Sequence, residues 1–128
     1  MDDRQKIEEL YVRYAFAIDG RQYDEWISCF TEDGVFDSSR MGRFAGRDEL
    51  RKFVEKYERL LEGGQIRHVI SNVLVDVAGE RARGRCYLNL YLTKNGKTEM
   101  IGVGTYEDQL RKVDGRWLFE SRKVVLDV

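Results

Sequence analysis

The 128-residue sequence predicts one α+β domain over residues 1–128, in which helices pack on one face of a curved antiparallel sheet. Two observations carry this prediction. Apolar residues recur at three- and four-residue spacing in the first half of the chain, whereas the second half contains β-rich runs joined by short turns. A strongly curved, cone-shaped sheet covered by helices leaves a concave side, where ligand pockets prefer to form.

Three N-terminal helices are expected. Residues 3–18 bury one helical face, and Gly20 is suited to cap that helix. A short second helix follows at residues 22–30. The third begins near residue 47 and ends at the Gly63-Gly64 pair, which cannot easily continue a helix.

The strands are predicted mainly in the second half. Residues 31–34 are expected to form a turn, residues 35–38 a short strand, and residues 41–46 a loop that folds over the face of that strand. Asn95-Gly96 and Asp114-Gly115 are strong hairpin signals, so an antiparallel meander is the simplest topology. The four long runs are residues 66–77, 81–93, 98–113 and 116–126.

The composition is that of a globular protein, with 42% hydrophobic and 35% charged residues. Lys plus Arg (22) nearly cancels Asp plus Glu (23), so no basic surface for nucleic acid is expected. The first residues lack the apolar segment of a signal peptide, and no run approaches the length of a membrane span. We therefore expect a cytoplasmic protein without nucleic-acid or membrane partners.

The two cysteines, Cys29 and Cys86, lie in a helical and a strand pattern and form no Cys-x-x-Cys motif. Buried thiols are favoured over a disulfide or a reactive pair. Phosphate-binding loops, nucleophile elbows and the His-Glu-x-x-His zinc motif are also absent. We expect no metal and no cofactor.

Asp19 and His68 are the leading candidates for chemistry. His68 is the only histidine, and the two-residue period places it with Asn72 on the mixed face of its strand, which suits a pocket wall. Asp19 ends an apolar helix, where the helix dipole disfavours a negative charge. Taken separately, a turn aspartate and a hydrogen-bonded core or surface histidine are the commoner interpretations. If Asp19 reaches His68, it orients the ring for proton transfer.

Two further side chains are candidates to assist that proton transfer. Tyr14 lies five residues before Asp19, and its phenol is suited to donate a proton to an oxygen atom. Arg122, in the last predicted strand, is suited to hold an anionic or departing group. Packing is the alternative for Tyr14, and a solvated position on the strand face is the alternative for Arg122.

A second group of residues is predicted to shape and orient a small, mostly apolar ligand. Cross-strand aromatic packing is the alternative for these strand residues, and it is favoured at least for Tyr91 and Tyr106. The predicted binding residues are Trp26, Phe30, Phe53, Asn72, Tyr87, Asn89 and Tyr106.

The order and spacing of several fragments resemble the SnoaL-like group of the nuclear-transport-factor-2-like superfamily, over nearly the whole chain. These fragments are Ile7-x-x-Leu10-Tyr11, Asp19, Trp26-x-x-x-Phe30-x-x-Asp33-Gly34, Arg67-His68-x-x-x-Asn72, Gly104-x-Tyr106 and Asp114-Gly115-x-Trp117 with Arg122. The resemblance implies a cystatin-like fold. Its dehydratase and dehydrochlorinase branch pairs a helix-end Asp with a strand His, which correspond to Asp19 and His68. Tyr14 and Arg122 correspond to a tyrosine and an arginine of that branch. The second pocket histidine of scytalone dehydratase is absent here.

The resemblance implies a cofactor-independent lyase of dehydratase type, acting on a small hydrophobic, aromatic, steroid-like or polyketide-like substrate. In this hypothesis His68, oriented by Asp19, abstracts a proton while Tyr14 or Arg122 assists the leaving group. An isomerase or cyclase using the same base, or Asp19 as the base itself, is an alternative. So is a non-catalytic ligand-binding or scaffold domain like the small subunit of a ring-hydroxylating dioxygenase. A homodimer or homotrimer is expected to bury the exposed sheet face.

Overall fold

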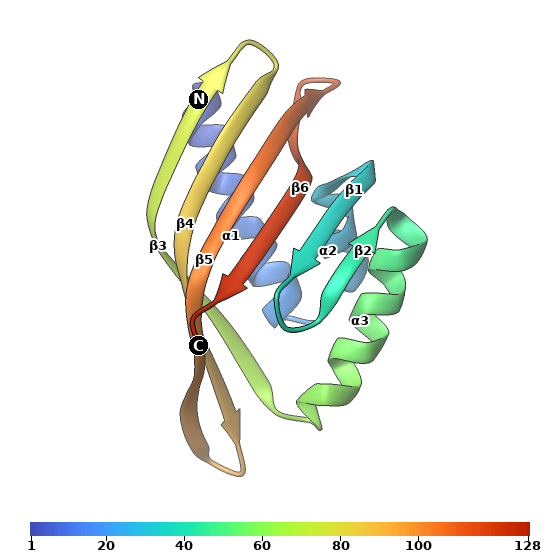
Figure 1. The fold of residues 1–128 in the computed structure, drawn as a ribbon, viewed down its shortest axis with the longest axis vertical. Helices are drawn as coiled ribbons and strands as arrows, with labels where there is room; N and C mark the ends of the chain where they lie inside the picture. The colour runs from blue at the N-terminus through green and yellow to red at the C-terminus, as the bar shows by residue number, and fades with distance from the viewer.

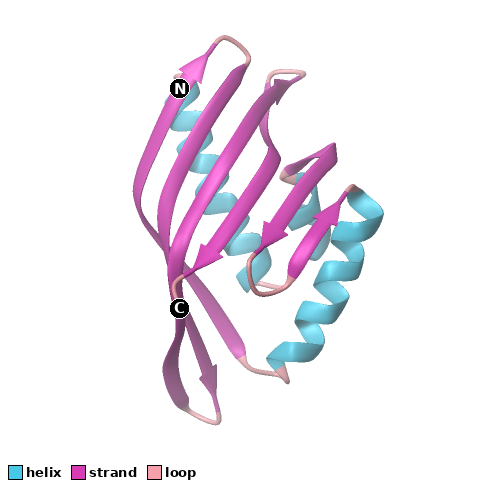
Figure 2. Ribbon diagram, in the orientation of Figure 1, coloured by secondary structure: helices cyan, strands magenta, loops and turns pink.

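One six-stranded sheet and three helices form the fold in the computed structural model, which describes residues 1–128. The strands lie in the order β2-β1-β6-β5-β4-β3, and the sheet curves around α1 (Figure 1). Figure 2 shows α3 beside the short strands β1 and β2. The expected α+β class with a curved sheet is therefore confirmed. The elements are α1 (Asp3–Asp19), α2 (Tyr23–Ser28), β1 (Phe30–Ser38), β2 (Gly42–Ala45), α3 (Arg47–Leu61), β3 (Gln65–Ala78), β4 (Arg81–Lys94), β5 (Lys97–Val113) and β6 (Arg116–Leu126).

The region between α2 and α3 differs from the sequence prediction in two ways. Residues 31–34 belong to β1 rather than to a separate turn, and the expected loop at residues 41–46 contains β2, which pairs antiparallel with β1. The four long strands β3 to β6 form the predicted antiparallel meander, whereas β1 joins this meander by pairing with β6 in parallel. Parallel pairing joins strands that are distant in sequence, and no hairpin turn between them announces it.

Helix α1 is well defined at both ends. Asp2 and Gln5 form a reciprocal capping box at its start, and Gly20 follows its last residue, Asp19. Its buried face carries Ile7 and Tyr14, and α1 packs against β3. The packing brings the C-terminal end of α1 to the wall of the sheet, with Asp19 at the tip.

Strand β3 contains a bulge that the strict two-residue period does not predict. The register with β4 shifts between Ser71 and Leu74, and Asn72 adopts a left-handed conformation with φ of 57°. Before the bulge, Ile66 and His68 face the helices, whereas after it Val75 takes the buried position and Asn72 itself is exposed. The bulge therefore changes which side chains of β3 face the helices.

The convex face of the sheet carries a group of exposed apolar side chains. Val69 and Leu74 of β3 and Tyr87 of β4 are each about half exposed. A homo-oligomer that covers these residues stays a prediction. None of the three helices has the length and apolar character needed to span a lipid bilayer.

Candidate functional site

An apolar cavity of about 190 Å³ lies between α1, α3 and the concave side of the sheet. Hydrophobic side chains make up 16 of its 19 lining residues, and Ser38, Arg40 and His68 are the others. Such a lining, with few polar groups, is typical of sites for small organic molecules. The lining residues are Tyr14, Ile18, Phe36, Ser38, Arg40, Met41, Phe53, Tyr57, Leu60, Leu61, Ile66, His68, Leu88, Leu90, Leu92, Ile101, Tyr106, Val124 and Leu126.

The structure brings Asp19 and His68 together at this cavity. Asp19 Oδ1 lies 2.6 Å from His68 Nδ1, and Oδ2 accepts a hydrogen bond of 2.9 Å from the backbone N–H of His68. Both side chains are more than nine-tenths buried. With the carboxylate accepting from Nδ1–H, the neutral ring carries its free lone pair on Nε2, for which the protein supplies no hydrogen-bond partner.

A second set of contacts fixes the end of α1 against β3. Arg21, in a left-handed conformation directly after the helix, donates to the Gly64 carbonyl at 2.7 Å and to the Glu58 carboxylate at 2.9 Å. Gln65 donates to the backbone carbonyl of Asp19 at 2.8 Å. These contacts tie α1, α3 and the start of β3 together, so the distance between Asp19 and His68 does not depend on one flexible side chain.

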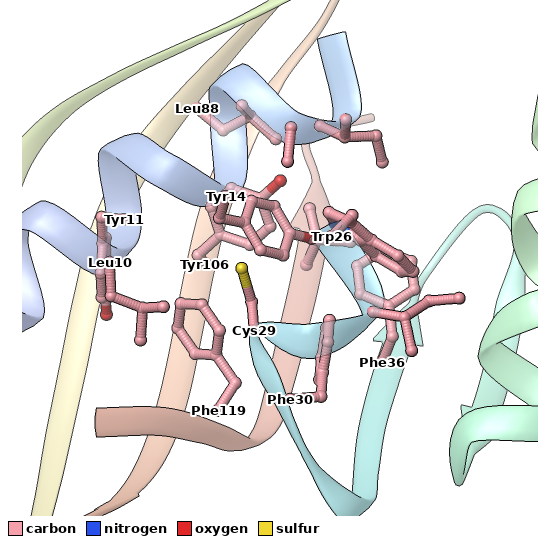
Figure 3. Packing of buried hydrophobic residues seen from close by; sticks show 14 of the residues in the cluster. Leu10, Tyr11, Tyr14, Trp26, Cys29, Phe30, Phe36, Leu88, Tyr106 and Phe119 are labelled. Carbon is pink, nitrogen blue, oxygen red and sulfur yellow. The ribbon is translucent and has the colours of Figure 1, made fainter. Parts of the chain in front are cut away.

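Tyr14 lies in the wall of the same cavity, within an aromatic cluster. Its ring centre is 5.7 Å from that of Trp26 and 6.1 Å from that of Tyr106 (Figure 3). Burial raises the pKa of Tyr14 to about 12, although the positive charge of Arg122 and the polar neighbours Trp26 and Tyr106 act in the opposite direction. The phenol is therefore protonated at neutral pH and is a hydrogen-bond donor.

Arg122 is the predicted catalytic residue that the structure places elsewhere. It does not line the cavity but lies behind Tyr14 and Tyr106, and it is 1% exposed. Its Nε is 3.0 Å from Oδ1 of the buried Asp108, which also accepts a hydrogen bond from the Tyr11 hydroxyl. The prediction that Arg122 directly contacts a departing group is therefore wrong, because the rings of Tyr14 and Tyr106 lie between Arg122 and the cavity.

Comparison with known proteins shows the family to which the chain belongs. The family model described as "SnoaL-like domain" matches residues 1–123. The chain belongs to the SnoaL-like family. Among the solved structures it resembles, a variant of Rv3472, a protein of unknown function from Mycobacterium tuberculosis, is 30% identical, with a TM-score of 0.89, over 98% of this chain and 72% of that one. ActVI-ORFA from Streptomyces coelicolor is 22% identical, with a TM-score of 0.86, over 97% and 94% of the two chains. An uncharacterized curated relative, Rv2910c of M. tuberculosis, is 28% identical over 90% of this chain and 80% of its own length.

In this SnoaL-like domain the predicted binding residues fall into three groups. Phe53 and Tyr106 line the cavity. Trp26 and Phe30 are fully buried one layer behind it, where both contact the ring of Tyr14. These two residues support the wall and do not touch the enclosed space.

The third group, Asn72, Tyr87 and Asn89, lies outside the cavity, and its prediction as pocket residues is wrong. Asn72 is exposed at the β3 bulge. Tyr87 and Asn89 belong to the convex face of β4, because the alternate positions, among them Leu88 and Leu90, are the buried ones. The polar character of Tyr87 and Asn89 suggested that their face of β4 lines the pocket, but the opposite, apolar face does so.

Sequence reasoning missed several residues that line the cavity. The apolar alternation in β4 carried a signal for Leu88 and Leu90, since it marks the buried face of a strand. Tyr57 belongs to the apolar stripe of the predicted third helix. The spacing of that stripe does not show whether a residue lines a pocket or lies in the core. Arg40 sits in the β1–β2 turn and lines the cavity only because the chain folds back there.

The two cysteine thiols of the SnoaL-like domain are poor candidates for nucleophiles. Cys29 and Cys86 are free and buried, and burial raises the pKa of each thiol to about 11. No group of three or more His, Cys, Asp or Glu side chains has the arrangement of a metal site. Besides the Asp19–His68 pair, the polar groups at the cavity are the hydroxyls of Tyr14, Tyr57 and Tyr106, together with Ser38 and Arg40.

Proposed function

We propose that this SnoaL-like domain is a cofactor-independent acid–base enzyme, a lyase of dehydratase type, acting on a small aromatic or polyketide-like molecule. The observation that carries the proposal is the hydrogen-bonded Asp19–His68 pair at an otherwise apolar cavity. A buried charge-capable pair is costly to maintain in such surroundings, and such pairs cluster at functional sites.

His68 is the proposed base. Its Nε2 takes a proton from a carbon atom next to an activating group such as a carbonyl, while Asp19 holds the ring and stabilises the imidazolium that forms. The hydrogen bond to the backbone N–H of His68 keeps the carboxylate in place during this charge change. The low exposure of both side chains excludes competing water.

Tyr14 is the proposed acid. As the carbon–hydrogen electron pair forms the new double bond, the carbon–oxygen bond of the leaving hydroxyl breaks, and the phenol gives that hydroxyl its proton so that water departs. Its protonated state at neutral pH suits this role. The phenolate then recovers a proton from the imidazolium of His68, directly or through the released water, and both residues return to their starting states.

The size of the cavity limits the substrate. At about 190 Å³ it exceeds the ~150 Å³ of an engineered apolar cavity that holds benzene. A molecule of one or two rings fits this space, whereas a four-ring steroid is larger than the enclosed volume. Membership of the SnoaL-like family supports an activity of the polyketide cyclase or dehydratase type.

Two alternatives keep the same site. An isomerase or cyclase would use the same proton abstraction by His68 and return the proton to a different atom. A pure binding domain would use only the apolar walls, and the small number of polar lining groups favours binding of this kind. The two classes differ in one measurable respect, which is whether bound molecules lose a carbon-bound proton.

The test is proton exchange in D₂O, followed by NMR, with the bicyclic ketone 2-tetralone as probe, together with a dehydration screen of β-hydroxy ketones of one and two rings. We expect the parent protein to accelerate exchange at the carbon next to the carbonyl and His68→Ala to abolish the acceleration. Tyr87→Phe, on the convex face, is the matched control and should behave as the parent. Equal rates for the parent and His68→Ala would remove the proposed base. Binding without any exchange or turnover would favour the binding domain.

A further inference from the structure

The Asp108–Arg122 ion pair is a buried charged group that the proposed reaction does not use. The side chains are 0% and 1% exposed, and they occupy facing positions on the adjacent strands β5 and β6. Replacement of such a pair by apolar residues of similar volume is often neutral or stabilising. Stability alone therefore does not explain why a guanidinium occupies this position.

The surroundings of Arg122 are mainly aromatic. The guanidinium carbon lies 3.5 Å from the ring centre of Tyr106 and 4.3 Å from that of Tyr14, and the rings of Phe119 and Tyr11 are 4.5 and 4.8 Å away. Tyr106 and Tyr14 are also walls of the cavity. The cation thus lies directly behind the two phenols that face the ligand space, and Figure 3 shows these two rings next to each other.

We propose that Arg122 is a positioning residue, which orients and polarises the Tyr14 phenol, backed by Tyr106, so that Tyr14 donates a hydrogen bond to a ligand oxygen atom. The inference rests on the proposed function for the identity of the site, and it adds the chemical class of the ligand. That ligand carries a carbonyl or a developing oxyanion directed at the part of the cavity wall formed by Tyr14 and Tyr106.

Two physical effects support this role. Stacking against a planar guanidinium fixes the orientation of an aromatic ring, which a flexible aliphatic neighbour would not do. A positive charge behind the ring also stabilises the electron density that collects on the phenol oxygen when its proton is donated. In agreement, the charge of Arg122 lowers the pKa of Tyr14, against the larger effect of burial, which raises it. Asp108 keeps Arg122 itself charged and in place.

The experiment compares the affinities of two probes of similar shape, the ketone 1-tetralone and the hydrocarbon tetralin, by titration calorimetry. A loss of packing weakens both probes together, whereas a loss of polarisation weakens only the ketone. In the double variant Asp108→Asn/Arg122→Met, which removes both charges, we expect the ketone preference to fall about threefold to tenfold, the range of one neutral hydrogen bond. Arg122→Lys keeps the charge and should retain most of the preference.

A double-mutant cycle identifies the tyrosine through which Arg122 acts. Tyr14→Phe should lower the ketone preference by itself, and the effect of Asp108→Asn/Arg122→Met should shrink in the Tyr14→Phe background. Parallel losses for both probes, or a ketone preference in folded Arg122→Lys as low as in Tyr14→Phe, would overturn the proposal. If the double variant does not fold, Arg122→Lys and Tyr14→Phe still decide the question. Because only binding is measured, a protein without exchange activity leaves the result interpretable.

Discussion

Two buried aspartates of this protein each pair with a basic side chain, and the two pairs differ in what surrounds them. Asp19–His68 joins the end of α1 to β3 at the cavity, while Asp108–Arg122 joins two adjacent strands behind a layer of aromatic rings. Histidine exchanges a proton near neutral pH, whereas arginine stays charged under all ordinary conditions. The pair that can transfer a proton is thus the one at the cavity. The permanently charged Arg122 is separated from the cavity by the rings of Tyr14 and Tyr106.

The two pairs also differ in how strongly the fold depends on them. Asp19 and His68 are held by neighbouring contacts that survive a change in either side chain, such as those of Arg21 and Gln65. Asp108 by contrast is the one carboxylate beside Arg122, and Tyr11 donates to it as well. We therefore expect removal of Asp108 alone to act mainly on stability, and substitutions of Asp19 or His68 to act mainly on activity.

Asp108→Ala should have the largest effect on folding. It leaves the guanidinium of Arg122 buried without a counter-charge and the Tyr11 hydroxyl without an acceptor, which together should cost about 3–5 kcal/mol of unfolding free energy. Urea denaturation followed by circular dichroism measures the loss. Asp76→Ala, at an exposed position of β3, is the control and should stay within about 0.5 kcal/mol of the parent. A loss at Asp108 no larger than at Asp76 would contradict the distinction between the pairs.

Asp19→Asn should separate activity from stability. The amide cannot stabilise an imidazolium, so the rate of carbon-bound proton exchange should fall about a hundredfold or more. The unfolding free energy should fall by only about 1 kcal/mol, because an amide oxygen still accepts hydrogen bonds. Kinetics and denaturation of one protein sample measure both quantities. A stability loss that matches Asp108→Ala, with exchange unchanged, would assign Asp19 a structural role instead.

Gly84→Ala should have an intermediate effect, because this glycine gives Tyr11 the room to reach Asp108. A Cβ atom at position 84 would collide with the Tyr11 hydroxyl, and the ring cannot move away without breaking that hydrogen bond. We expect a loss of about 1–3 kcal/mol in denaturation experiments. Gly102→Ala on the adjacent strand is the matched control, since its Cβ would meet Leu126 at an ordinary distance of 3.6 Å. Equal tolerance of both substitutions would show that Tyr11 is not tightly held.

The sequence predicts the regular parts of this fold well because their signals are local. The helix ending at Asp19 and the hairpins at Asn95-Gly96 and Asp114-Gly115 follow from periodicity and turn chemistry. The parallel pairing of β1 with β6 and the bulge at Asn72 depend on distant contacts, and no local pattern marks them.

The same limit applies to the candidate site. Asp19 and His68 were paired only through the family pattern, since each has an ordinary local explanation. The sequence and the family resemblance predict that Arg122 holds a departing group in the cavity, but one layer of aromatic side chains separates it from the ligand space. The spacing of residues along a strand indicates which face a side chain is on. It does not indicate how many layers of side chains separate that residue from a cavity.

Alkaline pH should reveal the buried tyrosines that surround Arg122. Burial raises the pKa of Tyr14 to about 12 and that of Tyr106 well above its ordinary value, while in the unfolded chain tyrosines ionise near pH ~10. A folded pKa above the unfolded one contributes stability that is complete below pH ~10 and declines as the pH rises toward the folded value, because the unfolded chain releases protons first. The unfolding free energy should fall by roughly 1.4 kcal/mol for each such tyrosine per pH unit in this range.

Denaturant titrations between pH 9 and 12, together with the phenolate absorbance at 295 nm, measure this decline. Tyr14→Phe should make the slope against pH shallower, because one buried phenol no longer contributes, whereas Tyr87→Phe on the convex face should leave it unchanged. The buried phenols should ionise only as the protein unfolds. Ionisation of all seven tyrosines near pH 10 in a folded protein would mean that water reaches the ring layer, and then Arg122 could not act from a dry site behind Tyr14 and Tyr106.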